Sequence, residues 1–454
     1  MSRMTFAFAG LAFISLAGPV SAKVSDQDAQ KLKTVLTPWG AERAGNKEGT
    51  IPAWTGGFSQ PPAGVNPNGV MPDFFAGDAK LLTIDAGNVD RYADKLSTGV
   101  IYMIKNYKGY HIDIYPTHRT AVAPQWYYDK TFYNATHAEL QDNNWLAGVV
   151  GGIPFPIPQN GKELSWNINV TWKGTQTHAL TGFYIVAPNS APQQTSEASQ
   201  NYLYPYNDPS VTLADYNGYD LMSRVDTVGP PSRVGEANLS WTSTDQRKHD
   251  LEIWQYLVGQ RRLRKAPNIT YDGTYPDCGG MVSVDELAIW LGAPDRYDFK
   301  IIGKKELYLP YNNNKVFHDT STSLLGPLYL NPDDVRWELH RVWVVDLDLA
   351  PGKHHLIPHR RIYVDEDTWA PLLGDDYDAR GTLWKVAEGL TYMNPFIPTA
   401  VLNSQVTYET RGAGYCAATM VTTDHPREFP LLPIRPPYSA SYWQPATLAA
   451  ESAR

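Results

Sequence analysis

The sequence predicts a mainly β protein of the α+β class, built around an antiparallel meander. Its 454 residues include 35 glycines and 35 prolines, which favour frequent turns, and 28 tyrosines and 14 tryptophans, which favour strands. Hydrophobic residues make up 43% of the chain, which supports a large core and excludes a disordered chain. The net charge of −8 argues against a generally basic nucleic-acid-binding protein, so we expect no nucleic-acid partner.

Strand signals begin near residue 163. Trp166, Ile168, Val170 and Trp172 alternate with polar residues, and this period of two predicts a strand with one apolar and one wet face. A neighbouring strand is expected at 182–187. From residue 250 onward, strand patterns separated by turn-prone segments recur at 253–263, 299–309, 339–349, 360–364, 383–386 and 401–409.

Helix signals are fewer and lie mostly in the N-terminal third. A helix is predicted over 25–36, with Ser25 as its N-cap, and another over 88–107, where apolar residues recur at helical spacing. Shorter helices are expected near 137–145 and 213–224. We divide the chain into a helical and coil extension that wraps the sheet, the curved sheet itself, and a tail rich in proline and aromatic residues, over 23–162, 163–424 and 425–454 respectively. The tail is expected either to pack on the body as an extended arm or to be a loose terminus.

The first 22 residues have the features of a secretory signal peptide. Arg3 precedes an apolar stretch over 6–20, which is too short for a spanning helix, and small residues precede a cleavage site after Ala22. We therefore expect a periplasmic protein. The two cysteines, Cys278 and Cys416, are expected to form a disulfide in that compartment, with two buried free thiols as the alternative.

Motifs of the common enzyme classes are absent from the sequence, including the phosphate-binding loop, the dinucleotide fingerprint, the zinc-protease helix and the nucleophile elbow. We expect no enzymatic activity and no cofactor. Four histidines fall within 20 residues, and we interpret them as ordinary strand positions rather than a metal site, because adjacent strand residues point to opposite faces. They are His340, His354, His355 and His359.

Acidic residues cluster in two short segments. A pair of carboxylates could act as acid and base in a hydrolase, but turns in which aspartates cap the backbone and meet solvent explain the clusters more simply. The residues are Asp365, Glu366 and Asp367, then Asp375, Asp376 and Asp378.

A basic cluster lies at the end of an apolar strand pattern. Arg261, Arg262, Arg264 and Lys265 are candidates for contact with an anionic headgroup or a membrane surface. The alternative is that they pair with the acidic clusters just described, since ion pairing is the commoner use of surface arginine.

Several segments, in the same order, resemble one family of exported proteobacterial proteins. They are LTPWGAERAGNKEGTIPAWTGG at 36–57, YPTHRTA at 115–121, GIPFPIPQNG at 152–161, WQYLVGQRRLRKAP at 254–267, YDFKIIGKKELYLPYN at 297–312, ELHRVWVV at 338–345, and HRRIYVDEDTW followed by YDARGTLWKV within 359–386. The family is domain-of-unknown-function family 1329, which is grouped with the LolA/LolB-like lipoprotein carriers. The resemblance covers roughly residues 30–415 and does not include the tail.

The resemblance implies an incomplete antiparallel β-barrel with helices covering its concave face around an apolar cavity. If the resemblance holds, the residues expected to line this cavity are Trp166, Ile168, Val170, Trp172, Trp254 and Tyr256. Without the resemblance, the same residues would be expected to pack in the core.

The function that the resemblance implies is a periplasmic carrier or chaperone for a lipid, a lipoprotein acyl group or another hydrophobic compound. Its partners would be that compound and an outer-membrane protein or an inner-membrane transporter. The alternatives are an accessory subunit that docks through the tail and a hydrolase that uses the carboxylates of 365–378.

Overall fold

A computed structural model describes residues 24–60, 62–65, 71–249, 251–266, 271–412, 414–422, 424 and 432–452. The predicted signal peptide over 1–22 lies outside these residues. Among the described residues, no helix combines the length and the apolar character that a membrane crossing requires.

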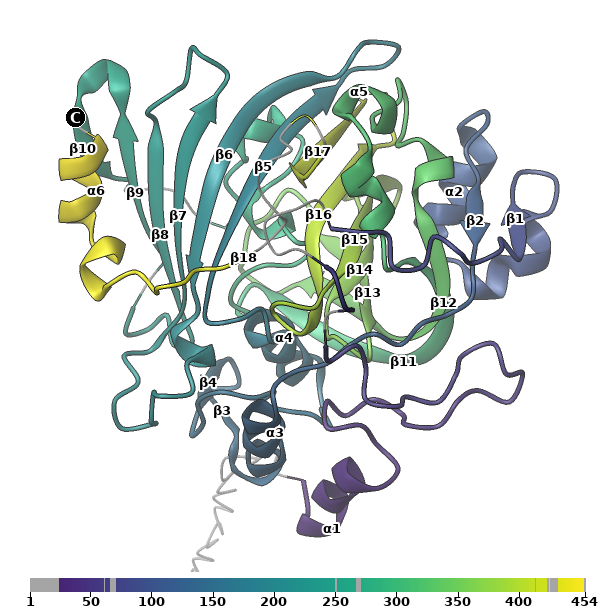
Figure 1. The fold of residues 1–454 in the computed structure, drawn as a ribbon, viewed down its shortest axis with the longest axis horizontal. Helices are drawn as coiled ribbons and strands as arrows, with labels where there is room; N and C mark the ends of the chain where they lie inside the picture. Colours follow the sequence, from purple (N-terminus) through teal and green to yellow (C-terminus); the bar gives the residue numbers. More distant parts are fainter. Residues whose placement is uncertain are drawn as a thin grey trace, which may run out of the picture.

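One large sheet of sixteen strands organises the described chain (Figure 1). Its path runs β1-β2-β12-β13-β14-β15-β16-β17-β5-β6-β7-β8-β9-β10, with β11 on β12 and β18 on β5. Strands β2 and β12 are parallel, and every other described pair is antiparallel. The path ends at β1 and β10 without closing, so the predicted incomplete antiparallel barrel is confirmed.

The sheet has two arms that meet where β17 pairs with β5. The β11–β17 arm contains β11 (Tyr297–Pro310), β12 (Arg336–Leu349), β13 (His359–Asp365), β14 (Pro371–Tyr377), β15 (Leu383–Asn394), β16 (Thr399–Glu409) and β17 (Gly414–Met420). The β5–β10 arm contains β5 (Gln176–Val186), β6 (Gln193–Leu203), β7 (Tyr219–Gly229), β8 (Ala237–Ser243), β9 (Glu252–Leu257) and β10 (Arg262–Lys265). Short strands complete the sheet at β1 (Leu82–Ile84), β2 (Ile112–Ile114) and β18 (Leu432–Pro433), and β3 (Glu139–Gln141) and β4 (Trp145–Ala147) form a separate hairpin.

The helices are short. The α-helices are α1 (Asp26–Ala29), α2 (Thr98–Asn106), α3 (Gln125–His137), α4 (Gly161–Val170), α5 (Ser321–Leu324) and α6 (Pro445–Ser452). The 3₁₀ helices are η1 (Gln30–Lys33), η2 (Val89–Lys95), η3 (Pro205–Asn207), η4 (Val258–Gln260), η5 (Pro276–Cys278), η6 (Val284–Glu286), η7 (Asn314–His318), η8 (Pro332–Asp334) and η9 (Ala440–Trp443).

The two N-terminal helices form where the sequence predicts them. The Ser25 hydroxyl accepts a hydrogen bond from the Asp28 backbone N–H at 3.1 Å and caps α1. The predicted helix over 88–107 is divided into η2 and α2, because Leu96 is extended and Ser97 caps a new helix through the Val100 N–H at 3.1 Å.

The strand predicted around Trp166 is wrong, since these residues form helix α4 and the segment after it. The Asn160 side chain caps α4 by accepting from the N–H groups of Lys162 and Glu163, both at 3.0 Å. Trp166 and Val170, four residues apart, then lie in one apolar cluster. The expected wet face is also buried, because the Asn167 amide bonds the backbone of Phe155. Because both faces of this segment are buried, the alternation of apolar and polar residues was misleading and does not reflect a strand with one wet face.

Three other local predictions are corrected by the structure. The helix expected at 213–224 is replaced by strand β7, and the helix expected at 137–145 by the β3–β4 hairpin. Helix α3 lies in a segment predicted as coil, where Pro124 precedes its first turn. The sequence patterns also missed β6, β8, β14 and β17 of the sheet and its short strands β1, β2 and β18.

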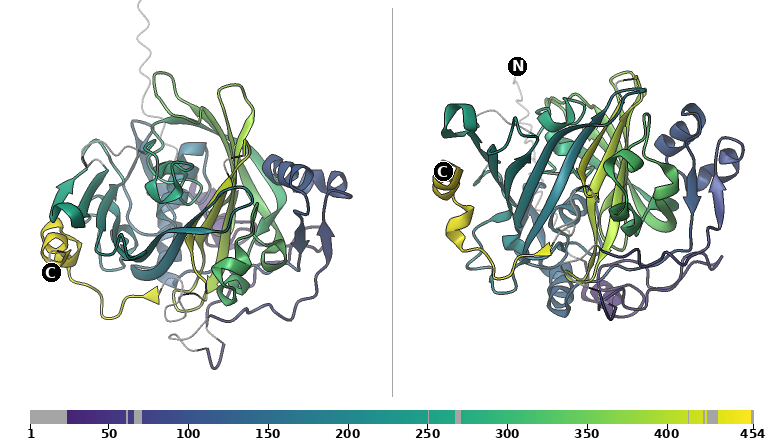
Figure 2. Two further views of the ribbon diagram at one scale, coloured as in Figure 1. Left: turned by 90° about the horizontal axis from the view of Figure 1, so that it is seen from above. Right: turned by 45° about the horizontal axis from the view of Figure 1, so that its top comes forward.

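The sheet curves, and its two faces carry different elements (Figure 2). The concave face holds α4 and the segment 271–293, shown by the contacts of Ile289 with Gly374 and Gly389 and of Phe183 with Tyr275. The convex face holds α2, whose Gly99 N–H bonds Asp375 of β14, and the α6 tail helix.

The described part of the tail is packed on the body. Leu432 of β18 pairs with His178 of β5, and α6 rests on β8, β9 and β10. Leu448 is fully buried in a cluster with Leu239 and Tyr256. Residues 432–452 therefore form the predicted arm rather than a loose terminus, while 425–431 lie outside the described residues.

Candidate functional site

The concave face of the β11–β17 arm is filled by paired charges. Arg360 is buried, and its guanidinium bonds Asp376 at 3.1 Å and the Ile289 carbonyl at 2.9 Å. Lys385 is also buried and pairs with Glu286 at 2.7 Å. Because Ile289 and Glu286 belong to the segment 271–293, that segment covers this half of the face.

A disulfide holds the same segment in place. Cys278 of η5 is bonded to Cys416 of β17, across a sequence separation of 138 residues. Deeper in the segment, the Ile289 N–H donates to the Gln405 side chain at 2.9 Å. The covalent bond and the buried polar contacts together fix the segment against the strands.

The first acidic cluster is buried and ion-paired, which corrects the expectation that it meets solvent. Asp367 accepts two hydrogen bonds from Arg119, at 2.6 and 2.7 Å, and Glu366 pairs with Lys304 at 2.8 Å. Burial raises the pKa of Glu366 to about 7, an effect that Lys304 opposes. These residues do occupy the turn between β13 and β14, but Arg119, far away in the sequence, reaches them from the N-terminal extension.

The second acidic cluster does not form a hydrolase site. Asp375 and Asp376 are consecutive on β14 and lie on opposite faces, bonded to Gly99 and to Arg360 respectively. Asp378 lies in the predicted turn, where it accepts from the N–H groups of Arg380 and Thr382. No two of these carboxylates face a common space.

The six cavity candidates do not come together. Trp166 and Val170 belong to one apolar cluster, and Ile168 and Trp172 belong to the main core. Trp254 and Tyr256 lie in a third cluster, on the convex face beneath α6. The structure therefore gives them no common lining.

The β5–β10 arm has one covered face. Arg224 of β7 pairs with Glu451 of α6 at 2.7 Å and lies under the Tyr442 ring. Strand register places Leu239 opposite Arg224, and Trp254 opposite Leu239, on this same side. The tail thus covers the convex face of β7, β8 and β9.

The opposite, concave face of this arm is different, and we call it the inner face. Alternation and register place Tyr202, Ser223, Ser240 and Ile253 in one row across β6 to β9. A second row contains Gln200, Val225, Asn238 and Gln255, while Leu221 and Leu257 lie beyond the rows. Apart from the buried Gln200, these side chains are only half-buried. The described helices and strands with the closest contacts to β8 and β9 are their neighbouring strands and α6, and α6 is on the other side.

A lysine and an aspartate interact electrostatically near the start of β7. Lys173 and Asp220 are both half-buried, and Thr242 donates to the Asp220 carboxylate at 2.9 Å. Burial lowers the pKa of Lys173 to about 8, which Asp220 opposes. Burial raises the pKa of Asp220 to about 6, against the hydrogen bond from Thr242 and the charge of Lys173. At pH 7 the pair is mostly ionised.

The basic cluster divides between the two faces of the edge hairpin. Lys265 is on the convex side, where it pairs with Glu252 at 2.6 Å and lies over Trp254. Arg262 and Arg264 are opposite Leu257 and Gln255 and so share the inner face. Arg261 is the left-handed residue of the turn. Among described residues, none of the four pairs with the acidic clusters. The arginine and lysine partners of those clusters are Arg119, Lys304, Arg341, Arg360 and Arg411.

The sequence interpretation missed most of the inner face. It assigned Lys173 to a wet strand face and read 213–224 as a helix, which concealed Leu221 and Ser223. The signal that was available is the alternation of Leu221, Ser223 and Val225 with Met222, Arg224 and Asp226.

The chain belongs to the family described as "Protein of unknown function (DUF1329)", which matches residues 83–449. An uncharacterized protein of Pseudomonas aeruginosa, PA3922, is 39% identical over 391 residues, which cover 83% of this chain and 84% of that protein.

Three crystal structures are similar at low identity. A DUF1329 family protein from Desulfovibrio piger is 12% identical with a TM-score of 0.42, covering 63% of this chain and 97% of that one. A putative outer membrane lipoprotein-sorting protein domain from Vibrio parahaemolyticus is 12% identical with a TM-score of 0.39, covering 61% and 92%. LolA superfamily protein NE2245 from Nitrosomonas europaea is 10% identical with a TM-score of 0.32, covering 57% and 89%.

Proposed function

We propose that the protein is a periplasmic carrier that binds an amphiphilic hydrophobic compound, such as a lipid or a lipoprotein acyl group, on the inner face. The observation that carries this proposal is the half-buried state of Leu221 and Val225 on β7 and of Ile253 and Leu257 on β9, on a face whose opposite side is covered. Serine, threonine and asparagine side chains of β8 lie between them, and a concave face that mixes apolar and polar groups is typical of a site for an amphiphilic ligand.

The arginines at the open edge suit the head of such a compound. Arg262 and Arg264 are exposed, and they neighbour Leu257 and Gln255 across the hairpin. A guanidinium there can pair with a phosphate or carboxylate while the chain lies over the apolar side chains. Each buried methylene contributes about 0.8 kcal/mol, so a contact of ten methylenes is worth about 8 kcal/mol before the costs of association.

The mechanism is passive binding and release. A compound enters at the edge strands, where β10 ends the sheet, and leaves to an acceptor of higher affinity. That acceptor is the outer membrane or one of its proteins, or an inner-membrane transporter.

A pair of valines on one strand tests the site. Val225 is half-buried on the inner face, and Val228, three residues on, is 44% exposed. We expect Val225→Lys to weaken binding of a fluorescent long-chain fatty acid at least tenfold and Val228→Lys to leave binding unchanged. Thermal unfolding of both variants establishes that they are folded.

Equal affinity in the two valine variants would contradict the proposed site. Failure of the folded wild-type protein to bind the fatty acid or a phospholipid would contradict the carrier function itself.

A further inference from the structure

A second cluster of polar groups lies outside the inner face, in the β11–β17 arm. His340 of β12, and Asp365 and Asp367 at the end of β13, are all buried. One possible ligand atom from each lies within 4.8 Å of the others. Two carboxylates and one imidazole within this distance are a donor set that suits a divalent transition-metal cation.

One buried atom of the cluster has no hydrogen-bond partner. The Oδ2 atom of Asp365 accepts from Thr368 at 2.7 Å and Tyr311 at 3.2 Å, but its Oδ1 atom accepts none. The Nδ1 atom of His340 is 3.9 Å from this Oδ1, too far for a hydrogen bond. A cation bonded at about 2.1 Å to each atom would fit that separation.

The neighbours hold His340 in the orientation that a metal ligand needs. Its Nε2 atom faces Glu338 at 3.2 Å, and its ring stacks on Tyr311 at 3.8 Å between centroids. With Nε2 bonded to a carboxylate, Nδ1 is the nitrogen turned toward Asp365. Metal-binding histidines usually have a carboxylate on the second nitrogen, which fixes the ring and its tautomer.

The charge around the cluster also favours a cation. Arg119 is bonded to Asp367, and no lysine or arginine among the described residues bonds Asp365. A bound cation would compensate a carboxylate that the protein itself leaves without a basic partner.

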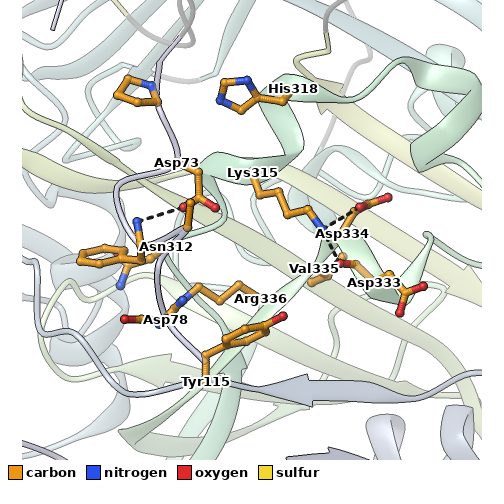
Figure 3. Close-up of a pocket in the computed structure, with 13 residues that line it drawn as sticks. Asp73, Asp78, Tyr115, Asn312, Lys315, His318, Asp333, Asp334, Val335 and Arg336 are labelled. Carbon is orange, nitrogen blue, oxygen red and sulfur yellow. Dashed lines mark hydrogen bonds and ion pairs between the residues drawn. The ribbon is translucent and has the colours of Figure 1, made fainter. Parts of the chain in front are cut away.

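A pocket of about 510 Å³ lies near this cluster (Figure 3). Asn312 and Arg336 line it, and both donate to Oε1 of Glu338, at 3.0 and 2.6 Å. The other carboxylate oxygen of Glu338, Oε2, faces His340, so the Glu338 side chain lies between the pocket and the cluster. The lining includes more acids than bases, namely Asp73, Asp78, Asp333 and Asp334 against Lys315 and Arg336, which would attract cations.

We propose that His340, Asp365 and Asp367 bind one divalent cation of the zinc type, with Glu338 as the residue that positions His340. This differs from the expectation that His340 is an ordinary strand position. The site is independent of the inner face and does not require the carrier function.

The test measures zinc binding by the full-length protein after treatment with a chelator. We expect one Zn²⁺ per chain in equilibrium dialysis, with affinity at least tenfold weaker in Asp365→Asn and His340→Gln. The matched control is Asp375→Asn, since Asp375 is equally buried but has hydrogen-bond donors in Gly99 and Tyr363. We expect its zinc affinity to match the wild type.

A surface group of His111, Asp113 and Asp333 could also bind zinc, so His111→Gln serves as a second control. X-ray absorption of the zinc-loaded wild type covers the case in which the variants do not fold, and should show one imidazole with oxygen ligands. The proposal is overturned by no stoichiometric binding, by loss of binding in His111→Gln, by full affinity in Asp365→Asn, or by a spectrum without an imidazole ligand.

Discussion

The two arms of the sheet differ in what lies on their concave faces. On the β11–β17 arm, the segment 271–293 contributes Asp285 and Glu286 to the buried bases Arg360 and Lys385, and Cys278 ties it to β17. On the β5–β10 arm, the same alternation of side chains leaves Leu221, Val225 and Ile253 half-buried. An apolar strand face becomes core or remains a surface depending on a distant segment, which strand periodicity does not reveal.

The electrostatics of the arms differ in the same way. Most charges of the first arm are buried and paired within the protein, where they hold the structure together, and Asp365 is the exception. On the second arm, the Lys173–Asp220 pair retains contact with solvent, and Arg262 has no ion pair among the described residues. The first arm therefore mainly serves stability, and the second is available for binding. Four measurements test this contrast.

The largest effect is expected from Arg360→Met. This change leaves Asp285 and Asp376 buried without their guanidinium partner, and we expect a loss of about 3–5 kcal/mol in the free energy of unfolding. Urea denaturation measures it. Arg262→Met on the exposed edge is the control, with a change within about 0.5 kcal/mol; similar losses for the two variants would abolish the distinction between the arms.

Removal of the disulfide is expected to have the next largest effect. Replacing both Cys278 and Cys416 by serine releases the segment 271–293 from β17 and should lower the free energy of unfolding by about 2–4 kcal/mol. Thermal unfolding with and without reductant gives the measurement. Reductant should lower the melting temperature of the wild type and leave that of the double variant unchanged. A wild-type melting temperature that does not respond to reductant would contradict the Cys278–Cys416 disulfide.

A substitution in the tail helix α6 is expected to have a smaller effect on the free energy of unfolding, with local changes confined to the convex side. Leu448→Ala creates a cavity over Leu239 and Tyr256, and we expect a loss of about 2–3 kcal/mol. Amide hydrogen exchange should accelerate in β8 and β9 but not in β14. If fatty-acid binding were abolished along with stability, the tail would be part of the binding site.

The smallest effect is a pH dependence centred in the β11–β17 arm. Burial raises the pKa of Asp375 to about 7, so folding favours its neutral form. The stabilisation is present below the ordinary aspartate pKa near 4 and is lost as pH rises toward 7. Urea denaturation from pH 4 to 8 measures this slope. Asp375→Asn should flatten the slope, and an unchanged slope would mean that other groups cause it.

Local sequence patterns predicted three long strands well, because β11, β12 and β16 combine a period of two with clear turn residues at their ends. They failed at α4, where Asn160 caps a helix whose two faces are both buried. They also failed at β7, which was read as a helix.

The site was harder to predict than the fold. Arg262 and Arg264, which were predicted to contact a headgroup, are exposed at the edge of the inner face, whereas Trp254 and Tyr256 are covered by α6 from the far end of the chain. The acidic residues Asp365 and Asp367 were expected in solvent, because nothing near them in the sequence indicates that Arg119 reaches them. Contacts between distant segments decide burial, and a single sequence does not show them.

The most direct test of the account uses a fatty acid with a photoactivatable group at the end of its chain. After irradiation, mass spectrometry of peptides locates the attachment. The account predicts labelling on β7 and β9, at or beside Leu221, Val225 and Ile253, and its loss in Val225→Lys. Labelling confined to the convex face or to the segment 271–293 would contradict a binding site on the inner face.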